Sequence, residues 1–166
     1  MKPQDIVNEK SLWIFGYGSL VWKPDFKFKR SKIGYIQGYK RRFWHGDNFY
    51  RGDDLMPGRV VTLVEDGNWV EFVPRDDDQS PLIALVYIAT ADNPIYLGPA
   101  SPEEIAAQIS TCKGKTGDNI EYLLRLAQFM RLYCPGVEDD HLFSIEAAAL
   151  ALMPYVMGSY WSVPTP

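Results

Sequence analysis

Short apolar runs alternate with clusters of turn-forming residues over the first part of the chain. Runs that are rich in β-branched and aromatic residues, and bounded by Gly, Pro, Asn or Asp, are typical of strands. They predict strands over residues 12–15, 33–38, 41–44, 59–64, 69–73 and 82–89. The run 12–15 predicts a buried strand, and the run 82–89, apolar on both faces, predicts a central one. Residues 45–48 and 51–54 are expected to form loops.

From residue 101 onward the apolar positions recur at helical spacing. Ser101, Pro102 and Glu104 have the arrangement of a capping box, with proline at the first helical position. This helix is expected to end at Gly114. Its expected buried face consists of Ile105, Ile109 and Cys112.

Two further helices are expected after the first. Asp118 should cap the second helix, with Glu121 at the reciprocal position. The third should begin near residues 139–140 and stop at Pro154, because proline lacks the backbone donor that a helix needs. The residues expected inside are Leu123, Leu124, Ala127 and Met130 in the second helix, and Leu142, Ile145, Ala149 and Leu152 in the third.

This order, strands first and helices after, predicts an α+β fold. At 166 residues the chain fits one domain that is large enough to bury a core. We expect a flexible N-terminus over residues 1–11, the domain over 12–153 and a tail over 154–166.

Composition narrows the class of protein. A hydrophobic content of 46% argues against disorder, and no apolar run approaches membrane-spanning length. The polar residues 1–11 lack the apolar stretch of a secretion signal. The two cysteines, Cys112 and Cys134, fit reduced thiols in the cytosol better than a disulfide framework. Two histidines without clustered ligands argue against a metal site.

The charge is unevenly distributed. Residues 1–60 hold 12 Lys and Arg against 6 Asp and Glu, whereas residues 61–166 hold 5 against 15. The basic part could attract an acidic small molecule, while the net charge of −4 argues against a nucleic acid partner. The alternative is that these charges are only solvated surface.

The stretch with the clearest candidate chemistry is the turn Gly16-Tyr17-Gly18-Ser19, between the runs 12–15 and 20–22. Glycine permits positive φ and close approach of a ligand to the backbone. Consecutive N–H groups in such a turn can bind an anion, and Ser19 adds a hydroxyl. A tight turn with a packed tyrosine is the structural alternative. The third glycine of a dinucleotide fingerprint is absent, because Val21 stands at its position.

Several longer motifs resemble one family. They are F-G-Y-G-S-L-V-W-K-P-D-F, R-R-F-W-H-G-D, R-G-D-D-L-M-P-G-R-V-V-T-L, D-N-P-I-Y-L-G-P-A and N-I-E-Y-L-L-R-L-A. In this order, over residues 12 to about 150, they resemble the ChaC family of glutathione-specific γ-glutamylcyclotransferases, most closely the stress-induced animal members. The resemblance implies a small mixed β-barrel flanked by helices. It also implies cleavage of glutathione to 5-oxoproline and cysteinylglycine without metal or coenzyme.

The resemblance also implies which residues would bind substrate. The γ-glutamyl head would lie on the glycine turn, formed by Phe15, Gly16, Tyr17, Gly18, Ser19 and Leu20. An arginine suits the glycine carboxylate of glutathione, and the candidates are Arg42, Arg51 and Arg59, each with a surface or ion-pair role as the alternative. Tyr122 could direct its hydroxyl into the site or simply pack in the core. A Notch-type receptor precursor as partner is implied by the resemblance alone.

The chain departs from the family between Gly67 and Val70. Family members have about 35 further residues there, the size of a strand and helix with a turn, and this segment carries the glutamate that acts as acid and base. No catalytic residue is therefore assigned, and Glu65 and Glu71 are only weak substitutes. Tyr50 stands where the family usually has histidine.

The lost segment leaves three hypotheses open for the chain. It is a γ-glutamylcyclotransferase by resemblance; it is a catalytically inactive form that binds γ-glutamyl compounds or a protein partner; or it is too short to fold stably. Loss of one barrel strand would leave unpaired edges, and loss of a helix would expose an apolar face.

Overall fold

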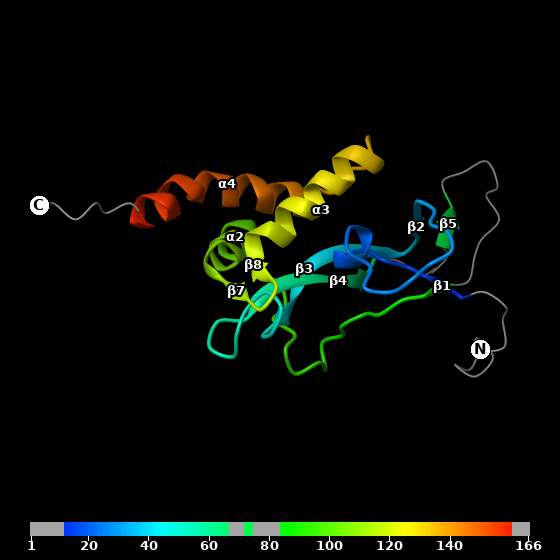
Figure 1. Cartoon of the computed structure of the whole chain (residues 1–166), viewed down its shortest axis with the longest axis horizontal. Helices are drawn as coiled ribbons and strands as arrows, with labels where there is room; N and C mark the ends of the chain where they lie inside the picture. Colours follow the sequence, from blue (N-terminus) through cyan, green and yellow to red (C-terminus); the bar gives the residue numbers. More distant parts are fainter. Residues whose placement is uncertain (1–11, 67–71, 75–83, 161–166) are drawn as a thin grey trace, which may run out of the picture.

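A computed structural model describes residues 12–66, 72–74 and 84–160 of the chain. The strands and the short 3-10 helix η1 come mostly first, and three α-helices follow, as the α+β prediction requires (Figure 1). The elements are β1 Trp13–Ile14, η1 Ser19–Val21, β2 Gly34–Ile36, β3 Tyr39–Asp47, β4 Gly58–Glu65, β5 Phe72–Pro74, β6 Ala84–Leu85, α2 Pro102–Thr111, β7 Lys113–Gly114, β8 Gly117–Asp118, α3 Asn119–Tyr133 and α4 Asp140–Tyr160.

The described strands form four two-stranded sheets rather than a closed barrel. The longest is the antiparallel pair β3–β4, whose register runs from Tyr39 opposite Glu65 to Asp47 opposite Gly58 and shifts between Arg42 and His45. β2 pairs with β5 in antiparallel fashion, and β1 pairs with β6 in parallel. The barrel implied by the resemblance is therefore open in the described part of the chain, because pairs of two or three residues leave their outer edges unpaired.

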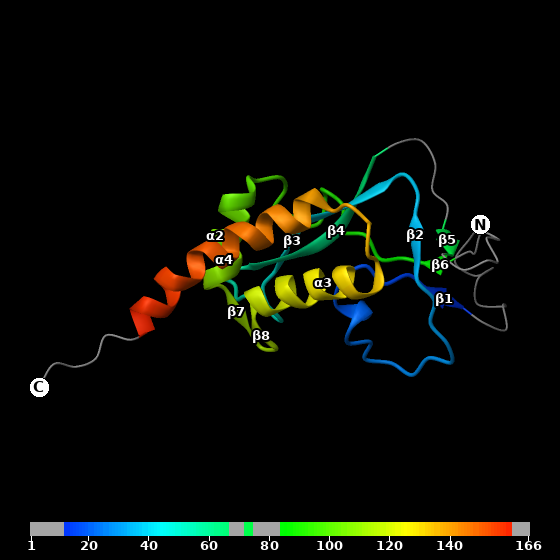
Figure 2. The same cartoon turned by 90° about the horizontal axis from the view of Figure 1, so that it is seen from above.

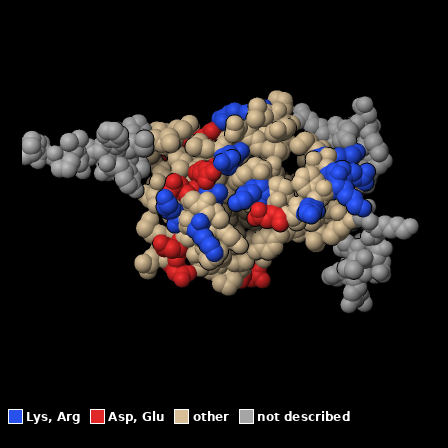
Figure 3. All heavy atoms as spheres, viewed as in Figure 1, with Lys and Arg blue, Asp and Glu red and all other residues tan. Residues whose placement is uncertain are grey.

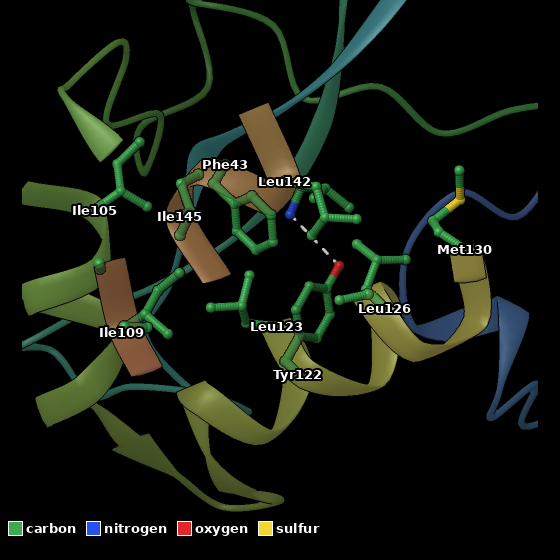
Figure 4. Close-up of a cluster of buried hydrophobic side chains, with 13 residues drawn as sticks. Phe43, Ile105, Ile109, Tyr122, Leu123, Leu126, Met130, Leu142 and Ile145 are labelled. Atoms are coloured by element: carbon green, nitrogen blue, oxygen red, sulfur yellow. Dashed lines mark hydrogen bonds between the residues drawn. The ribbon is translucent and has the colours of Figure 1, made fainter. Parts of the chain in front are cut away.

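The core lies between the helices and the β3–β4 pair. α2, α3 and α4 cover one face of that pair, and α3 and α4 lie side by side (Figures 1 and 2). Phe43 in the middle of β3 is fully buried and faces the helices (Figure 4). The fully buried aliphatic side chains around it are Ile105, Ile109, Leu123, Leu126, Leu142 and Ile145.

The prediction of a buried strand over residues 12–15 is wrong in extent and burial. β1 has only two residues, and 48% of Leu12 and 44% of Ile14 remain exposed. The predicted central strand over 82–89 is likewise reduced to β6, with 50% of Leu85 exposed, and residues 82–83 lie outside the described part. Two residues of parallel pairing cannot bury both faces of either strand.

The prediction of a loop at residues 45–48 is also wrong, because β3 continues to Asp47. His45, Gly46 and Asp47 pair with β4, and the Gly46 N–H donates to the Ile95 carbonyl at 2.7 Å. A Cβ on Gly46 would lie 2.6 Å from that carbonyl oxygen, so the glycine admits the crossing segment at the strand edge. The predicted strand 59–64 is confirmed as β4, and that at 69–73 corresponds to β5, although residues 69–71 lie outside the described part.

The first helix is confirmed with its capping box. The Ser101 hydroxyl accepts from the Glu104 N–H at 3.2 Å, and the Glu104 carboxylate accepts from the Ser101 N–H at 2.9 Å. The helix ends at Thr111, before Gly114, and Ile105, Ile109 and Cys112 are buried as expected.

The capping of the second helix differs from the prediction. Asp118 occupies the N-cap without a side-chain cap bond, and its carboxylate pairs with Lys113 at 3.2 Å instead. Glu121 pairs with Arg51 at 2.9 Å and with Arg125 at 2.8 Å. Of the residues expected inside α3, Leu123, Ala127 and Met130 are buried, but Leu124 is only half-buried and Leu126 is buried instead.

The third helix begins where it was predicted, with Leu142, Ile145 and Ala149 buried and Leu152 packed against the core. It does not stop at Pro154 but continues to Tyr160, so part of the predicted tail is helical. In the described part of the chain, no helix combines the length and apolarity that a membrane crossing requires.

Candidate functional site

The glycine turn lies between β1 and η1 and is closed by backbone hydrogen bonds. The Val21 N–H donates to the Gly18 carbonyl at 3.0 Å, and the Lys23 N–H donates to the Ser19 carbonyl at 2.8 Å. No hydrogen bond within the described chain is donated by the N–H of Gly16 or Gly18, so these donors are available to a ligand.

Both glycines are required by close contact rather than by positive φ. Neither is among the described glycines of positive φ, and Gly18 has φ −129°. A Cβ on Gly16 would lie 2.8 Å from the Leu20 Cβ, and one on Gly18 would lie 2.5 Å from the Tyr122 hydroxyl oxygen. The positive φ that glycine permits is therefore not used here.

Tyr122 supports the turn from α3. It is 5% exposed, its ring packs edge-on against Trp22 and Phe43, and its hydroxyl accepts from the Val61 N–H at 3.4 Å (Figure 4). Burial raises the pKa of Tyr122 well above its ordinary value, so the hydroxyl keeps its proton at neutral pH. The interpretation of Tyr122 as a packed core residue is confirmed, and its hydroxyl lies against Gly18 on the underside of the turn. A role of this hydroxyl in the substrate site stays a prediction.

Tyr17 fixes the turn to the segment after β6. Its hydroxyl donates to the Tyr87 carbonyl at 2.5 Å, and its ring lies 6.3 Å from that of Phe15. Burial raises the pKa of Tyr17 to about 12, so this hydroxyl also stays protonated. Tyr17 therefore acts as a donor that ties down the turn.

Two of the three candidate arginines hold the scaffold together. Arg51, 8% exposed, donates to the Asp118 carbonyl at 2.8 Å and to Glu121 at 2.9 Å. Arg59, 7% exposed, donates to the side chain of Gln108 and to the carbonyls of Phe43 and Gly98. Through these contacts, Nη1 of Arg51 and Nε and Nη1 of Arg59 are engaged by the protein itself.

Arg42 differs from these two arginines. It is half-buried, and the one hydrogen bond that the described structure gives it goes to the carbonyl of the preceding residue at 2.9 Å. Of the three candidates, Arg42 is the one whose guanidinium makes no described hydrogen bond outside its own strand.

Arg41, which sequence reasoning missed, contacts the turn directly. Its guanidinium donates to the Tyr17 carbonyl at 3.1 Å and to one oxygen of Asp139 at 2.6 and 3.1 Å. Strand alternation places Arg41 on the same face of β3 as the buried Phe43, but the turn and Asp139, which that face meets, are distant in sequence.

Of the two weak substitutes for the catalytic glutamate, only Glu65 lies in the described part of the chain. Glu65 is exposed at the end of β4, opposite Tyr39, and no described side-chain contact links it to the turn. Glu71 lies outside the described residues. Among the residues that the structure describes, no group of three or more His, Cys, Asp or Glu side chains could hold a metal ion.

The fold defines an α+β protein in which the glycine turn, the predicted ligand site, is backed by a helix. The family model described as ChaC-like protein matches residues 12–71 and 66–151, and the chain belongs to this family. The glutathione-specific gamma-glutamylcyclotransferase 1 of Danio rerio is 63% identical to it, over 91% of this chain and 95% of the relative. The enzyme of the same name from Homo sapiens is 45% identical over 92% of this chain and 84% of the relative.

A crystal structure of a yeast gamma-glutamyl cyclotransferase specific to glutathione shares the fold. It superposes with a TM-score of 0.76 at 21% identity and covers 84% of this chain and 98% of the yeast chain. The α+β arrangement described above is therefore that of a known fold, even though its barrel is open here.

The comparisons also confirm that this chain is short by one segment. The alignment with the Danio rerio protein spans 187 positions, while 91% of 166 residues is about 151, so about 36 positions have no counterpart in this chain. The two stretches matched by the family model meet at residues 66–71, where the sequence predicts the gap.

Proposed function

We propose that this chain is a γ-glutamylcyclotransferase of glutathione degradation and that its glycine turn binds the γ-glutamyl head. The observation that carries the proposal is the 63% identity to a relative named for this activity, over nearly the whole of both chains. The free thiols of Cys112 and Cys134 support a cytosolic location, where glutathione would be the substrate.

The reaction defines what the site must supply. The α-amine of the γ-glutamyl group attacks its own γ-carbonyl, the amide bond to cysteine breaks, and 5-oxoproline and cysteinylglycine leave. A base takes a proton from the ammonium, donors stabilise the oxyanion, and an acid protonates the departing amine.

The described turn can supply the donors. Phe15 and Leu20 frame it, the unpaired N–H groups of Gly16 and Gly18 offer hydrogen bonds, and Ser19 adds a hydroxyl. Backbone donors held rigidly at a developing oxyanion contribute strongly to such reactions. Arg42 is our candidate for the glycine carboxylate, and Tyr122 supports the turn from beneath.

The proton transfers are assigned to the segment of about 36 residues that this chain lacks. The resemblance to the ChaC family implies that this segment carries the acid–base glutamate. Among the described residues, the Asp139 carboxylate is linked to the turn through Arg41, and it is already engaged by Arg41 and by the Leu142 N–H. On this proposal the 166 residues supply the substrate-binding part of a γ-glutamylcyclotransferase, and rapid turnover requires the missing segment. The receptor-precursor partner implied by the resemblance stays a prediction.

Calorimetric titration tests this assignment without requiring turnover. We expect the chain to bind glutathione and to bind cysteinylglycine, which lacks the γ-glutamyl head, at least about tenfold more weakly, because the turn contacts only that head. Equal affinity for the two compounds, or no binding of glutathione, would contradict the proposal.

A further inference from the structure

The glycine turn is connected to the start of α4 through a chain of polar contacts. Asp139 precedes α4, and one of its carboxylate oxygens accepts from the Leu142 N–H at 3.0 Å. The other oxygen accepts two donors of Arg41, whose third nitrogen donates to the Tyr17 carbonyl. This path crosses from helix to strand to turn.

The contacts in this path are well shielded from water. The side chains of Arg41 and Asp139 are 12% and 13% exposed. Water and salt therefore screen these two charges only weakly. Charge-assisted hydrogen bonds between weakly screened charges are strong and keep a fixed geometry. The planar guanidinium is required here, because a lysine ammonium cannot reach a carboxylate and a carbonyl with the same fixed fork.

The Tyr17 carbonyl determines where the next donor points. In a trans peptide the C=O of one residue and the N–H of the next point in opposite directions. Arg41 holds the Tyr17 carbonyl toward the β3 face, so the Gly18 N–H is directed away from it. That N–H is one of the unpaired donors of the turn.

We propose that Arg41, held by Asp139, is a positioning residue that orients the Tyr17–Gly18 peptide so that the Gly18 N–H faces the substrate. The inference rests on the proposed function for the identity of the ligand. Arg41 does not touch the substrate in this scheme. It acts through the peptide unit that it holds.

The chain contains a matched control for this pair. Arg131 and Glu146 also form an ion pair that ends on α4, with Arg131 donating to Glu146 at 2.8 Å. The side chain of Glu146 is 7% exposed, similar to that of Asp139, whereas that of Arg131 is 55% exposed. Arg131 lies on α3, and none of its described contacts is with the turn. Substitutions in this second pair report only the loss of a helix contact.

The test compares four variants in the full chain by two measurements. Arg41→Lys and Asp139→Asn change the proposed pair, and Arg131→Lys and Glu146→Gln change the control pair. Asparagine caps helices as well as aspartate does, so Asp139→Asn keeps the start of α4 intact. The measurements are glutathione affinity by calorimetry and amide hydrogen exchange of Val21 and Lys23, whose N–H groups close the turn.

We expect Arg41→Lys and Asp139→Asn to weaken glutathione binding about tenfold and to speed exchange at Val21 and Lys23 about tenfold relative to the amides of α3. The control variants should leave both quantities at the wild-type value. Equal behaviour of all four variants would overturn the proposal. If the wild-type chain does not bind glutathione, the proposed function fails, and the exchange rates still decide whether Arg41 holds the turn.

Discussion

At the scale of single residues, the site depends on how closely the backbone of the turn approaches its neighbours. Gly18 lies against the Tyr122 hydroxyl, and a Cβ there would come within 2.5 Å of that oxygen. The glycine therefore serves the fold and the site together. It lets η1 pack on α3, and it leaves the turn N–H groups open to a ligand.

This contact predicts a coupling between Gly18 and Tyr122. Gly18→Ala should destabilise the chain by about 2 kcal/mol through overpacking, and Tyr122→Phe by about 1 kcal/mol through the lost hydrogen bond. The double variant should cost less than the two together, because removing the hydroxyl makes room for the new methyl group. Unfolding in urea measures each free energy.

A matched control uses a tyrosine away from the turn. Tyr35 on β2 is 51% exposed, so Tyr35→Phe should add independently to Gly18→Ala. Simple additivity between Gly18→Ala and Tyr122→Phe would contradict the close contact described for the turn.

Sequence alone could indicate the turn but not its support. Two glycines beside a serine mark backbone donors, and that chemistry is local. The choice among arginines is not local, because Arg41 and Arg42 are adjacent in sequence and project from opposite faces of β3. Only the position of α4 reveals which face meets the turn. Arg51 and Arg59 looked available in sequence because their partners, Glu121 and Gln108, lie far along the chain.

At the scale of elements, His141 fastens α4 to β3. Its Nε2 accepts from the Phe43 N–H at 3.0 Å. Burial, reinforced by the neighbouring Arg42, lowers the pKa of His141 to about 4, while Asp139 opposes this shift. A protonated ring could not accept that bond, so the contact exists only with neutral histidine.

The lowered pKa predicts a loss of stability in mild acid. The unfolded chain takes up this proton near pH 6.5 and the folded chain near pH 4, so the unfolded state binds more protons between these values. The free energy of unfolding should therefore fall, by about 2 kcal/mol after allowance for solvent screening, as the pH is lowered through this window.

His141→Gln provides the comparison. Glutamine can accept the same bond through its amide oxygen but does not titrate. The free energy of unfolding of the variant, measured in urea at several pH values, should fall less steeply between pH 6.5 and 4 than that of the wild type. Equal slopes would show that His141 does not carry this dependence.

The elements that could be predicted from sequence are those that local contacts determine. The Ser101–Glu104 capping box lies within one helical turn, and β4 has a strong local pattern of β-branched residues. The runs 12–15 and 82–89 were predicted to be buried strands because they are apolar. Burial of a strand depends on the strands and helices beside it, and those neighbours are not encoded in the run itself.

At the scale of the whole molecule, the end that carries β1 and β2 combines basic side chains with some of the exposed apolar ones. Lys and Arg side chains cluster at the end of the molecule where β1 and β2 lie (Figure 3). Three apolar side chains in or next to the β1–β6 pair are each more than two-fifths exposed, namely Leu12, Ile14 and Leu85. A chain that lacks a strand and helix of its family is expected to expose such a face, as the sequence predicted from the gap near residue 67.

The central claim is that this chain binds the substrate and that the missing segment supplies the acid–base group. The measurement that tests it most directly is 5-oxoproline release from glutathione by the 166-residue chain and by a version with the segment of the Danio rerio relative inserted at residues 66–71. A restored chain with its acid–base glutamate changed to glutamine is the control. We predict that the restored chain is faster by about a hundredfold or more, the usual contribution of general acid–base catalysis, and that the control is not. Equal rates for the short and the restored chains would contradict the claim, and Glu65→Gln and Glu71→Gln would then identify the group that acts instead.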